Sequence, residues 1–111
     1  MTPGKKLGDS DFEHMKTLKD IKTILAREKK ILTKKFNVKE IGIFGSYVRG
    51  GQEQKSDIDI LVEFSEPVGF FTFLDLEEHL SGLLGVKVDL VSKKALKPRI
   101  GKHILQELVP V

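Results

Sequence analysis

Apolar residues in the first third of the chain recur at steps of three, four and seven, a spacing that places them on one face of a helix. The pattern predicts helix from about residue 10 to residue 36. The members of this apolar face are Leu18, Ile21, Leu25, Leu32 and Phe36. Capping-box spacings begin at both Ser10 and Thr17, so one long helix, or a short helix followed by a longer one, satisfies the pattern. Asn37 is expected to end the helix.

Three segments rich in β-branched and aromatic residues predict strands over residues 38–44, 58–64 and 86–91. The residues between the first two, 45–56, are polar and rich in glycine, and this composition is typical of a loop or of a loop with one short turn of helix.

Two further helices are predicted in the second half of the chain. The first covers residues 71–84, with Gly85 placed to cap its C-terminal end. Its predicted apolar side chains are Phe71, Leu74, Leu80 and Leu84. The second begins at Pro98, because proline is tolerated in a first helical turn, and runs to Leu108. Residues 109–111 are expected to form an extended tail.

The resulting order is helix, strand, loop, strand, helix, strand, helix. It predicts an α/β (α+β) fold in which helices pack on a small mixed sheet of about three strands. The pattern alone does not say which strands are neighbours. Residues 1–9 contain one proline, two glycines and two lysines and are expected to be a flexible tail, followed by a single domain over residues 10–111.

The composition is that of a folded domain, because 40% of the 111 residues are hydrophobic and 32% are charged. No apolar run approaches the ~18 residues that a membrane helix needs, and the first residues lack the apolar stretch of a signal peptide. Cysteine is absent, which excludes disulfides and cysteine-ligated zinc in this chain. We therefore expect a cytoplasmic protein without a membrane partner.

Charge is nearly balanced, with 19 Lys and Arg against 16 Asp and Glu and a net charge of +3. The basic residues are spread out rather than gathered in the stripe typical of nucleic-acid binders, so nucleic acid is not the expected partner. Denser basic stretches at residues 27–30 and 34–35 are interpreted as a solvated helix face. A weak surface for an acidic partner or nucleic acid is the alternative.

Two carboxylates begin the second predicted strand. Asp57 and Asp59 are separated by one residue, so in a strand their side chains share one face, with Cα atoms about 6–7 Å apart. Such a pair is repulsive unless a positive charge lies between its members. Hard oxygen ligands suit Mg²⁺ or Mn²⁺, which also bind substrate phosphates. The pair predicts a divalent-metal site, with a turn cap and an exposed strand end as the alternative.

The segment before these acids is a candidate phosphate-binding loop. The first predicted strand ends at Gly45-Ser46, where backbone N–H groups and a hydroxyl could cradle phosphate oxygens. Glycine lets a backbone approach a ligand closely, and Arg49 could pair with a phosphate through its guanidinium. A simple turn from strand to loop is the alternative for this segment.

A third acid, Asp89, lies in the otherwise apolar third strand. Burial of a lone charge is costly, so this carboxylate needs a partner. The partner is either a lysine, Lys87 or Lys93, or a metal shared with Asp57 and Asp59 if the third strand lies beside the second. Two metal ions about 3.5–4 Å apart could then clamp the attacking and leaving oxygens of a phosphoryl displacement.

The combination of these motifs resembles the polymerase-β-type nucleotidyltransferase superfamily. It consists of Gly45-Ser46, ten intervening residues, the pair Asp57 and Asp59, and the later strand acid Asp89. Within that superfamily the chain resembles the minimal nucleotidyltransferase (MNT) domains, over about residues 39–111. The resemblance implies the minimal nucleotidyltransferase fold and an intact site, because none of these motif positions is missing.

The resemblance also implies a function. MNT domains are commonly the antitoxin of a toxin–antitoxin pair, and transfer AMP from ATP to a tyrosine of a helical HEPN ribonuclease toxin. In that scheme Gly45 and Ser46 bind the triphosphate, and Asp57 and Asp59 ligate both Mg²⁺ (or Mn²⁺) ions. Asp89 ligates the catalytic metal and helps to activate the tyrosine hydroxyl. A homo- or hetero-oligomer is compatible with this role.

Other functions compete with this prediction. The chain could neutralise a toxin by contact alone, or it could transfer a nucleotide to a small molecule such as an aminoglycoside, for which 111 residues leave little room. Three phenylalanines are interpreted either as core or as an apolar surface for a partner: Phe70, Phe71 and Phe73. The three histidines lack metal-ligand spacing and are interpreted as structural or surface residues: His14, His79 and His103.

Overall fold

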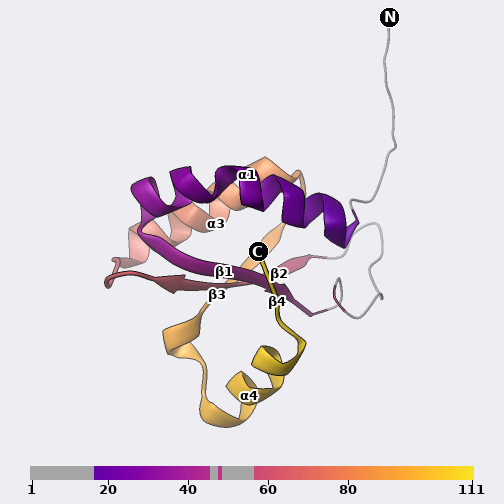
Figure 1. Cartoon of the computed structure of the whole chain (residues 1–111). Coiled ribbons are helices and arrows are strands. Elements are labelled where there is room, and N and C mark those ends of the chain that lie inside the picture. Colours follow the sequence, from indigo (N-terminus) through magenta and orange to yellow (C-terminus); the bar gives the residue numbers. More distant parts are fainter. Residues whose placement is uncertain (1–16, 46–47, 49–56) are drawn as a thin grey trace, which may run out of the picture.

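The computed structural model describes residues 17–45, 48 and 57–111 of the chain (Figure 1). Its elements are α1 (Leu18–Phe36), β1 (Val38–Phe44), β2 (Ile58–Phe64), α3 (Phe70–Leu84), β3 (Val88–Ser92), the 3₁₀ turn η2 (Lys93–Ala95), α4 (Pro98–Glu107) and β4 (Val109–Pro110). The predicted order is confirmed, and the bounds of α3, β3 and α4 differ from the prediction by one or two residues. No helix within the described ranges is both long enough and apolar enough to cross a membrane.

The strands form one four-stranded sheet in the order β3-β2-β1-β4. Strand β1 runs antiparallel to β2 and to β4, whereas β2 and β3 are parallel. The predicted mixed sheet is confirmed, with one strand more than expected. The tail prediction for residues 109–111 was wrong, because Val109 and Pro110 pair with Ile43 and Gly42. Two residues are too few to produce a readable period, so only the long-range pairing reveals this strand.

Helices α1 and α3 cover one face of the sheet, and α4 lies on the opposite side (Figure 1). The buried core is contributed by α1, α3 and the strands, with Ile21, Leu25, Leu32, Ile43, Leu76, Leu80 and Leu84 among its members. Successive strand residues point to opposite faces. In β2, Ile58, Ile60 and Val62 belong to this core, so Asp59 faces the other side of the sheet.

Helix α1 begins with a capping box. Thr17 Oγ1 accepts a hydrogen bond from the N–H of Asp20, and Asp20 Oδ2 accepts one from the N–H of Thr17, both at 3.1 Å. The capping-box spacing at Thr17 is therefore used, whereas Ser10 lies outside the described residues. Asn37 caps the C-terminal end with a φ of 58°, which confirms the predicted helix end.

Replacement of the cap tests this local signal. Thr17→Ala is expected to lower the free energy of unfolding by about 1 kcal/mol, because the N–H of Asp20 loses its acceptor. Urea denaturation followed by circular dichroism measures the change. The control is Thr23→Ala in the same helix, whose hydroxyl donates to the carbonyl of Lys19 and whose loss should change stability by less than about 0.5 kcal/mol. Equal effects of the two substitutions would argue against the cap.

The apolar face of α3 differs from the one predicted. The buried residues are Leu76, Leu80 and Leu84, whereas Phe71 and Leu74 are 79% and 39% exposed. The prediction for these two residues was wrong because two apolar stripes compete on this leucine- and phenylalanine-rich helix, and only packing selects between them. Gly85 caps the helix at a φ of 73°, as predicted, and its N–H donates to the carbonyl of Ser81 at 2.9 Å.

Candidate active site

The register of the sheet brings two of the predicted site residues together. In the parallel pair β2–β3, Asp59 lies directly opposite Asp89. Neighbouring strands are about 4.8 Å apart, and paired residues point to the same face. Ile58 and Val88, which precede these acids, are both buried on the helix-covered face. The two carboxylates therefore share the opposite face, where Asp59 is half-buried and Asp89 is exposed.

The third predicted acid, Asp57, immediately precedes β2. The N–H of Ile58 donates to the carbonyl of Lys87 at 3.0 Å, which extends the β2–β3 pairing toward this end of the sheet. Asp57 Oδ2 lies 4.0 Å from Lys87 Nζ, with both side chains well exposed. A pair this exposed contributes little to stability. Asp57 is thus held beside the start of the two strands without being locked in place.

The proposed lysine partners of Asp89 have other partners. Lys87 approaches Asp57, and Lys93 Nζ lies 3.6 Å from Glu63 Oε1. Neither of these two ion pairs involves Asp89. The ion pairs of these two described lysines therefore do not support the alternative in which Lys87 or Lys93 neutralises Asp89. The Asp89 carboxylate instead lies beside that of Asp59.

Gly45 directly follows β1 and lies against the Asp59 carboxylate. Its φ of 83° lies in the left-handed region, and a side-chain Cβ added there would overlap Asp59 Oδ2. The N–H of Gly45 donates to Glu107 Oε2 at 3.2 Å, and its carbonyl accepts from the N–H of Val48 at 3.0 Å. Glycine is required here for both reasons: the backbone conformation and the close approach of the carboxylate.

Glu107 was missed by sequence reasoning. It lies in the last turn of α4, an amphipathic helix whose hydrophobic pattern does not distinguish Glu107 from any other polar residue. One signal was available, since a negative charge in the last turn of a helix is disfavoured by the helix dipole. An acid in that position suggests a partner elsewhere in the fold, and the structure supplies the N–H of Gly45.

The donor chemistry of this site fits a hard divalent cation, because the carboxylates of Asp57, Asp59 and Asp89 gather at one end of the β2–β3 pair. Within the described ranges no three His, Asp or Glu side chains converge closely enough to hold a metal ion in their present positions. Binding would therefore involve side-chain rotation, which is fast for exposed residues. The predicted phosphate-binding residues Ser46 and Arg49 lie outside the described residues.

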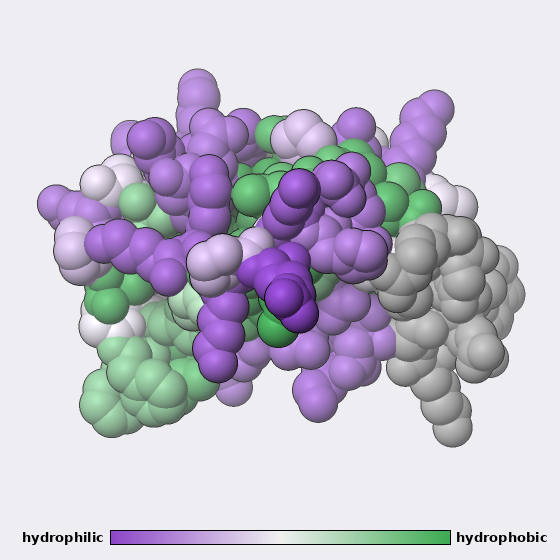
Figure 2. Space-filling view, turned by 90° about the horizontal axis from the view of Figure 1, so that it is seen from below, coloured by the Kyte–Doolittle hydropathy of each residue, from purple (hydrophilic) through white to green (hydrophobic). Residues whose placement is uncertain are grey.

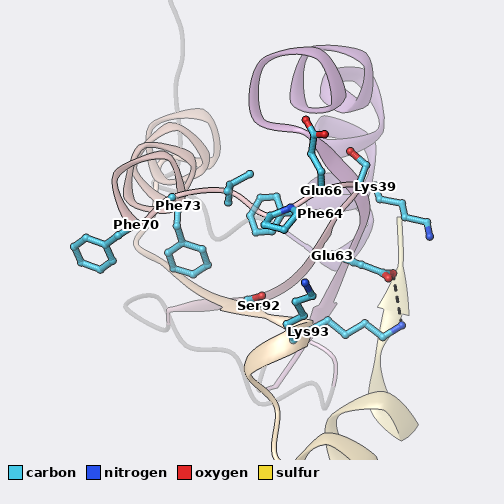
Figure 3. A pocket seen from close by; sticks show the side chains of 13 residues that line it. Lys39, Glu63, Phe64, Glu66, Phe70, Phe73, Ser92 and Lys93 are labelled. Atoms are coloured by element: carbon cyan, nitrogen blue, oxygen red, sulfur yellow. Dashed lines mark ion pairs between the residues drawn. The ribbon is translucent and has the colours of Figure 1, made fainter.

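A separate hollow of about 720 Å³ lies at the other end of β2 (Figure 3). Figure 3 shows Phe70 and Phe73 of α3 on one side of it and the Glu63–Lys93 ion pair on another. Strand β2 advances about 3.3 Å per residue, so Phe64 lies about 16 Å from Asp59, five residues earlier. This hollow is therefore not part of the carboxylate site.

The three phenylalanines divide between core and surface. Phe73 packs on the core and against Phe64, with ring centroids 6.4 Å apart. Phe70 and Phe71 are 70% and 79% exposed and touch each other edge to face. Hydrophilic side chains cover most of the face seen in Figure 2, and hydrophobic ones gather at its lower left. Phe73 therefore belongs to the core and Phe70 and Phe71 are surface residues, while the use of that surface by a partner stays a prediction.

Comparisons with known proteins point to nucleotidyltransferases. A family model described as "Nucleotidyltransferase domain" matches residues 18–111. Protein adenylyltransferase MntA of Thermococcus cleftensis is 52% identical over 97 residues, which cover 87% of this chain and 98% of that protein. A solved structure of a candidate minimal nucleotidyltransferase is 35% identical, with a TM-score of 0.70 and coverage of 90% and 100%. A chain in the solved structure of a mutant toxin–antitoxin complex that contains an MntA is 25% identical, with a TM-score of 0.65. The match covers 78% of this chain and 69% of that chain.

Proposed function

The chain belongs to the nucleotidyltransferase domain family, and from that premise we propose that it is a protein adenylyltransferase that moves AMP from ATP to a tyrosine of a partner protein. The observation that carries the proposal is the sheet register, which sets Asp59 beside Asp89 and against the turn at Gly45. The 52% identity to an MntA protein adenylyltransferase over nearly the whole of that protein supports the same reaction.

The acceptor in this proposal belongs to a HEPN ribonuclease toxin, and the chain is its antitoxin. Support comes from the MntA that is 25% identical to this chain and is part of a toxin–antitoxin complex, and from the T. cleftensis relative that bears the same name. A ribonuclease toxin acts where RNA and ATP are abundant, so the proposal keeps the expected cytoplasmic location. The antitoxin and toxin would form a hetero-oligomer.

The three acids have distinct roles in this proposal. Asp57, Asp59 and Asp89 would hold Mg²⁺ or Mn²⁺, which would supply positive charge to the triphosphate and to the leaving pyrophosphate. Asp59 is half-buried and fixed by its place in β2, so it would orient the α-phosphate from a rigid position. Asp89 is exposed, and would meet an incoming tyrosine, accept a hydrogen bond from its hydroxyl and take up its proton.

The phosphates of ATP are assigned to the turn that follows β1. Because the N–H and the carbonyl of Gly45 are engaged by Glu107 and Val48, we assign Gly45 the role of turning the chain closely past Asp59. Ser46 and Arg49 keep their predicted roles, in which a hydroxyl and a guanidinium bind phosphate oxygens.

The decisive experiment is AMP transfer to the natural neighbour. The chain is incubated with α-labelled ATP, Mg²⁺ and the product of the adjacent gene, and the label is then mapped by mass spectrometry. We expect label on a tyrosine of the toxin and loss of its ribonuclease activity. Chelation with EDTA should reduce transfer by at least about 100-fold, and added Mg²⁺ or Mn²⁺ should restore it, because the clustered carboxylates lose their counter-charge.

A contact-only antitoxin is the second candidate, and the exposed Phe70 and Phe71 favour it as an apolar contact surface. The same assay separates the two. Inhibition of the toxin without ATP, together with no label under Mg²⁺ or Mn²⁺, would contradict the transferase proposal and support binding alone. Inhibition that requires ATP and persists after the chain is removed would exclude the contact mechanism.

A further inference from the structure

Glu107 connects the last helix to the turn at the active site. It is half-buried at the end of α4, and α4 lies on the side of the sheet opposite α1 and α3, the side toward which Asp59 points (Figure 1). Its Oε2 accepts the N–H of Gly45 at 3.2 Å, across 62 residues of sequence. Gly45 thus lies between two carboxylates: Asp59 occupies the space where a side chain would be, and Glu107 binds the backbone.

The backbone around Glu107 is well anchored. The next residue, Leu108, packs against Gly42 so closely that a Cβ on that glycine would lie 2.8 Å from Leu108 Cδ1. Strand β4 then pairs with Gly42 and Ile43 of β1. The carboxylate of Glu107 is therefore presented to Gly45 from a segment that is itself fixed to β1, three residues before the turn.

This contact determines how the chain leaves β1. The Gly45 N–H is bound by Glu107 and the Gly45 carbonyl is bound by Val48, so the peptide groups on both sides of this residue have fixed orientations. A backbone N–H that loses its acceptor costs free energy, so the acceptor on Glu107 favours this one orientation of the turn. Without the hydrogen bond to Glu107, Gly45 would have the wide conformational freedom of a glycine at the start of a long loop.

We propose that Glu107 is a positioning residue for nucleotide binding: through Gly45 it fixes the turn that leads into the phosphate-binding loop. This inference rests on the proposed transferase function. Glu107 does not touch the nucleotide in this role. Its contribution is a hydrogen-bond acceptor in a fixed place, and α4 and β4 thereby become part of the support of the active site.

The test compares two substitutions of Glu107. Glu107→Ala removes the acceptor and should raise the KM for ATP by about tenfold, with kcat changed by less than about threefold. Glu107→Gln keeps an amide oxygen that accepts from the Gly45 N–H, and should stay within about threefold of the unmodified chain in both constants. Gln106→Ala, an exposed neighbour on the same helix, is the control and should change neither.

Two further readouts separate positioning from general stability. The dissociation constant of a non-hydrolysable ATP analogue should follow the KM, rising for Glu107→Ala and recovering in Glu107→Gln. The melting temperature is measured without nucleotide, and Glu107→Gln should match the unmodified chain. If Glu107→Ala does not fold, Glu107→Asp, which is one methylene too short to reach Gly45, takes its place and should show the same raised KM.

The outcomes distinguish this inference from the function on which it rests. An unmodified chain that neither binds nor uses ATP would overturn the proposed function and this inference with it. An active chain whose Glu107→Ala and Glu107→Asp variants keep the normal KM would overturn only the inference. Equal losses in Glu107→Gln and Glu107→Ala would also overturn it, because they would show that the charge matters rather than the acceptor.

Discussion

An Asp57→Ala, Asp59→Ala double variant is expected to lose AMP transfer by about 1,000-fold or more and to remain folded. The loss follows because the substitutions remove two of the three carboxylates at the start of the β2–β3 pair, and with them the charge arrangement that would orient ATP. The fold should persist because the ion pair of Asp57 with Lys87 is exposed and because Asp59 faces away from the buried core. Initial rates with labelled ATP measure the first effect, and urea denaturation measures the second.

A matched control for this variant is available on α3. Asp75→Ala with Glu78→Ala removes the same charge from two exposed positions of a helix on the other face of the sheet, and should leave transfer within about twofold. Transfer that survives in the double aspartate variant would remove these residues from the mechanism. A change in the free energy of unfolding above about 1 kcal/mol would show that the aspartates also support the fold.

Much of the fold could be predicted because its signals are local. Strands β1 and β2 have the bounds that their β-branched residues predict, and the caps at Thr17, Asn37 and Gly85 are the residues that cap chemistry selects. In contrast, the apolar face of α3 was misassigned, since Phe71 and Leu74 have the hydrophobicity of core residues. Hydrophobicity shows that a residue can be buried, and only the position of the neighbouring element decides whether it is.

The candidate site also combines residues that the sequence alone predicts with residues that only the three-dimensional fold brings together. The pairing of Asp57 with Asp59 is a matter of spacing and is visible in the sequence. The proximity of Asp89 depends on β3 lying parallel and next to β2, which no local pattern encodes. Glu107 and β4 were missed for a related reason. Both contact β1 or the residue that follows it across more than sixty residues, and a few long-range contacts leave no periodic trace in the sequence.

The second large effect is expected for Gly45→Ala, because Gly45 lies between Asp59 and Glu107. Alanine is strained at a φ of 83°, and its methyl group would overlap the Asp59 carboxylate. We expect the free energy of unfolding to fall by about 3 kcal/mol, from strain and overpacking together. Transfer by the folded fraction should fall by about 100-fold, because Asp59 would be displaced from the position in which it would orient ATP.

Gly82→Ala is the matched control for this substitution. Gly82 lies in α3, and a Cβ added there would meet no other atom within 4 Å. Alanine at that helical position should raise the free energy of unfolding by up to about 1 kcal/mol and leave transfer unchanged. Urea denaturation and labelled-ATP rates are measured on both variants, with rates corrected for the folded fraction. A Gly45→Ala chain as active and as stable as Gly82→Ala would show that the turn tolerates a side chain. The close packing of Asp59 on the end of β1 would then not be a requirement of the site.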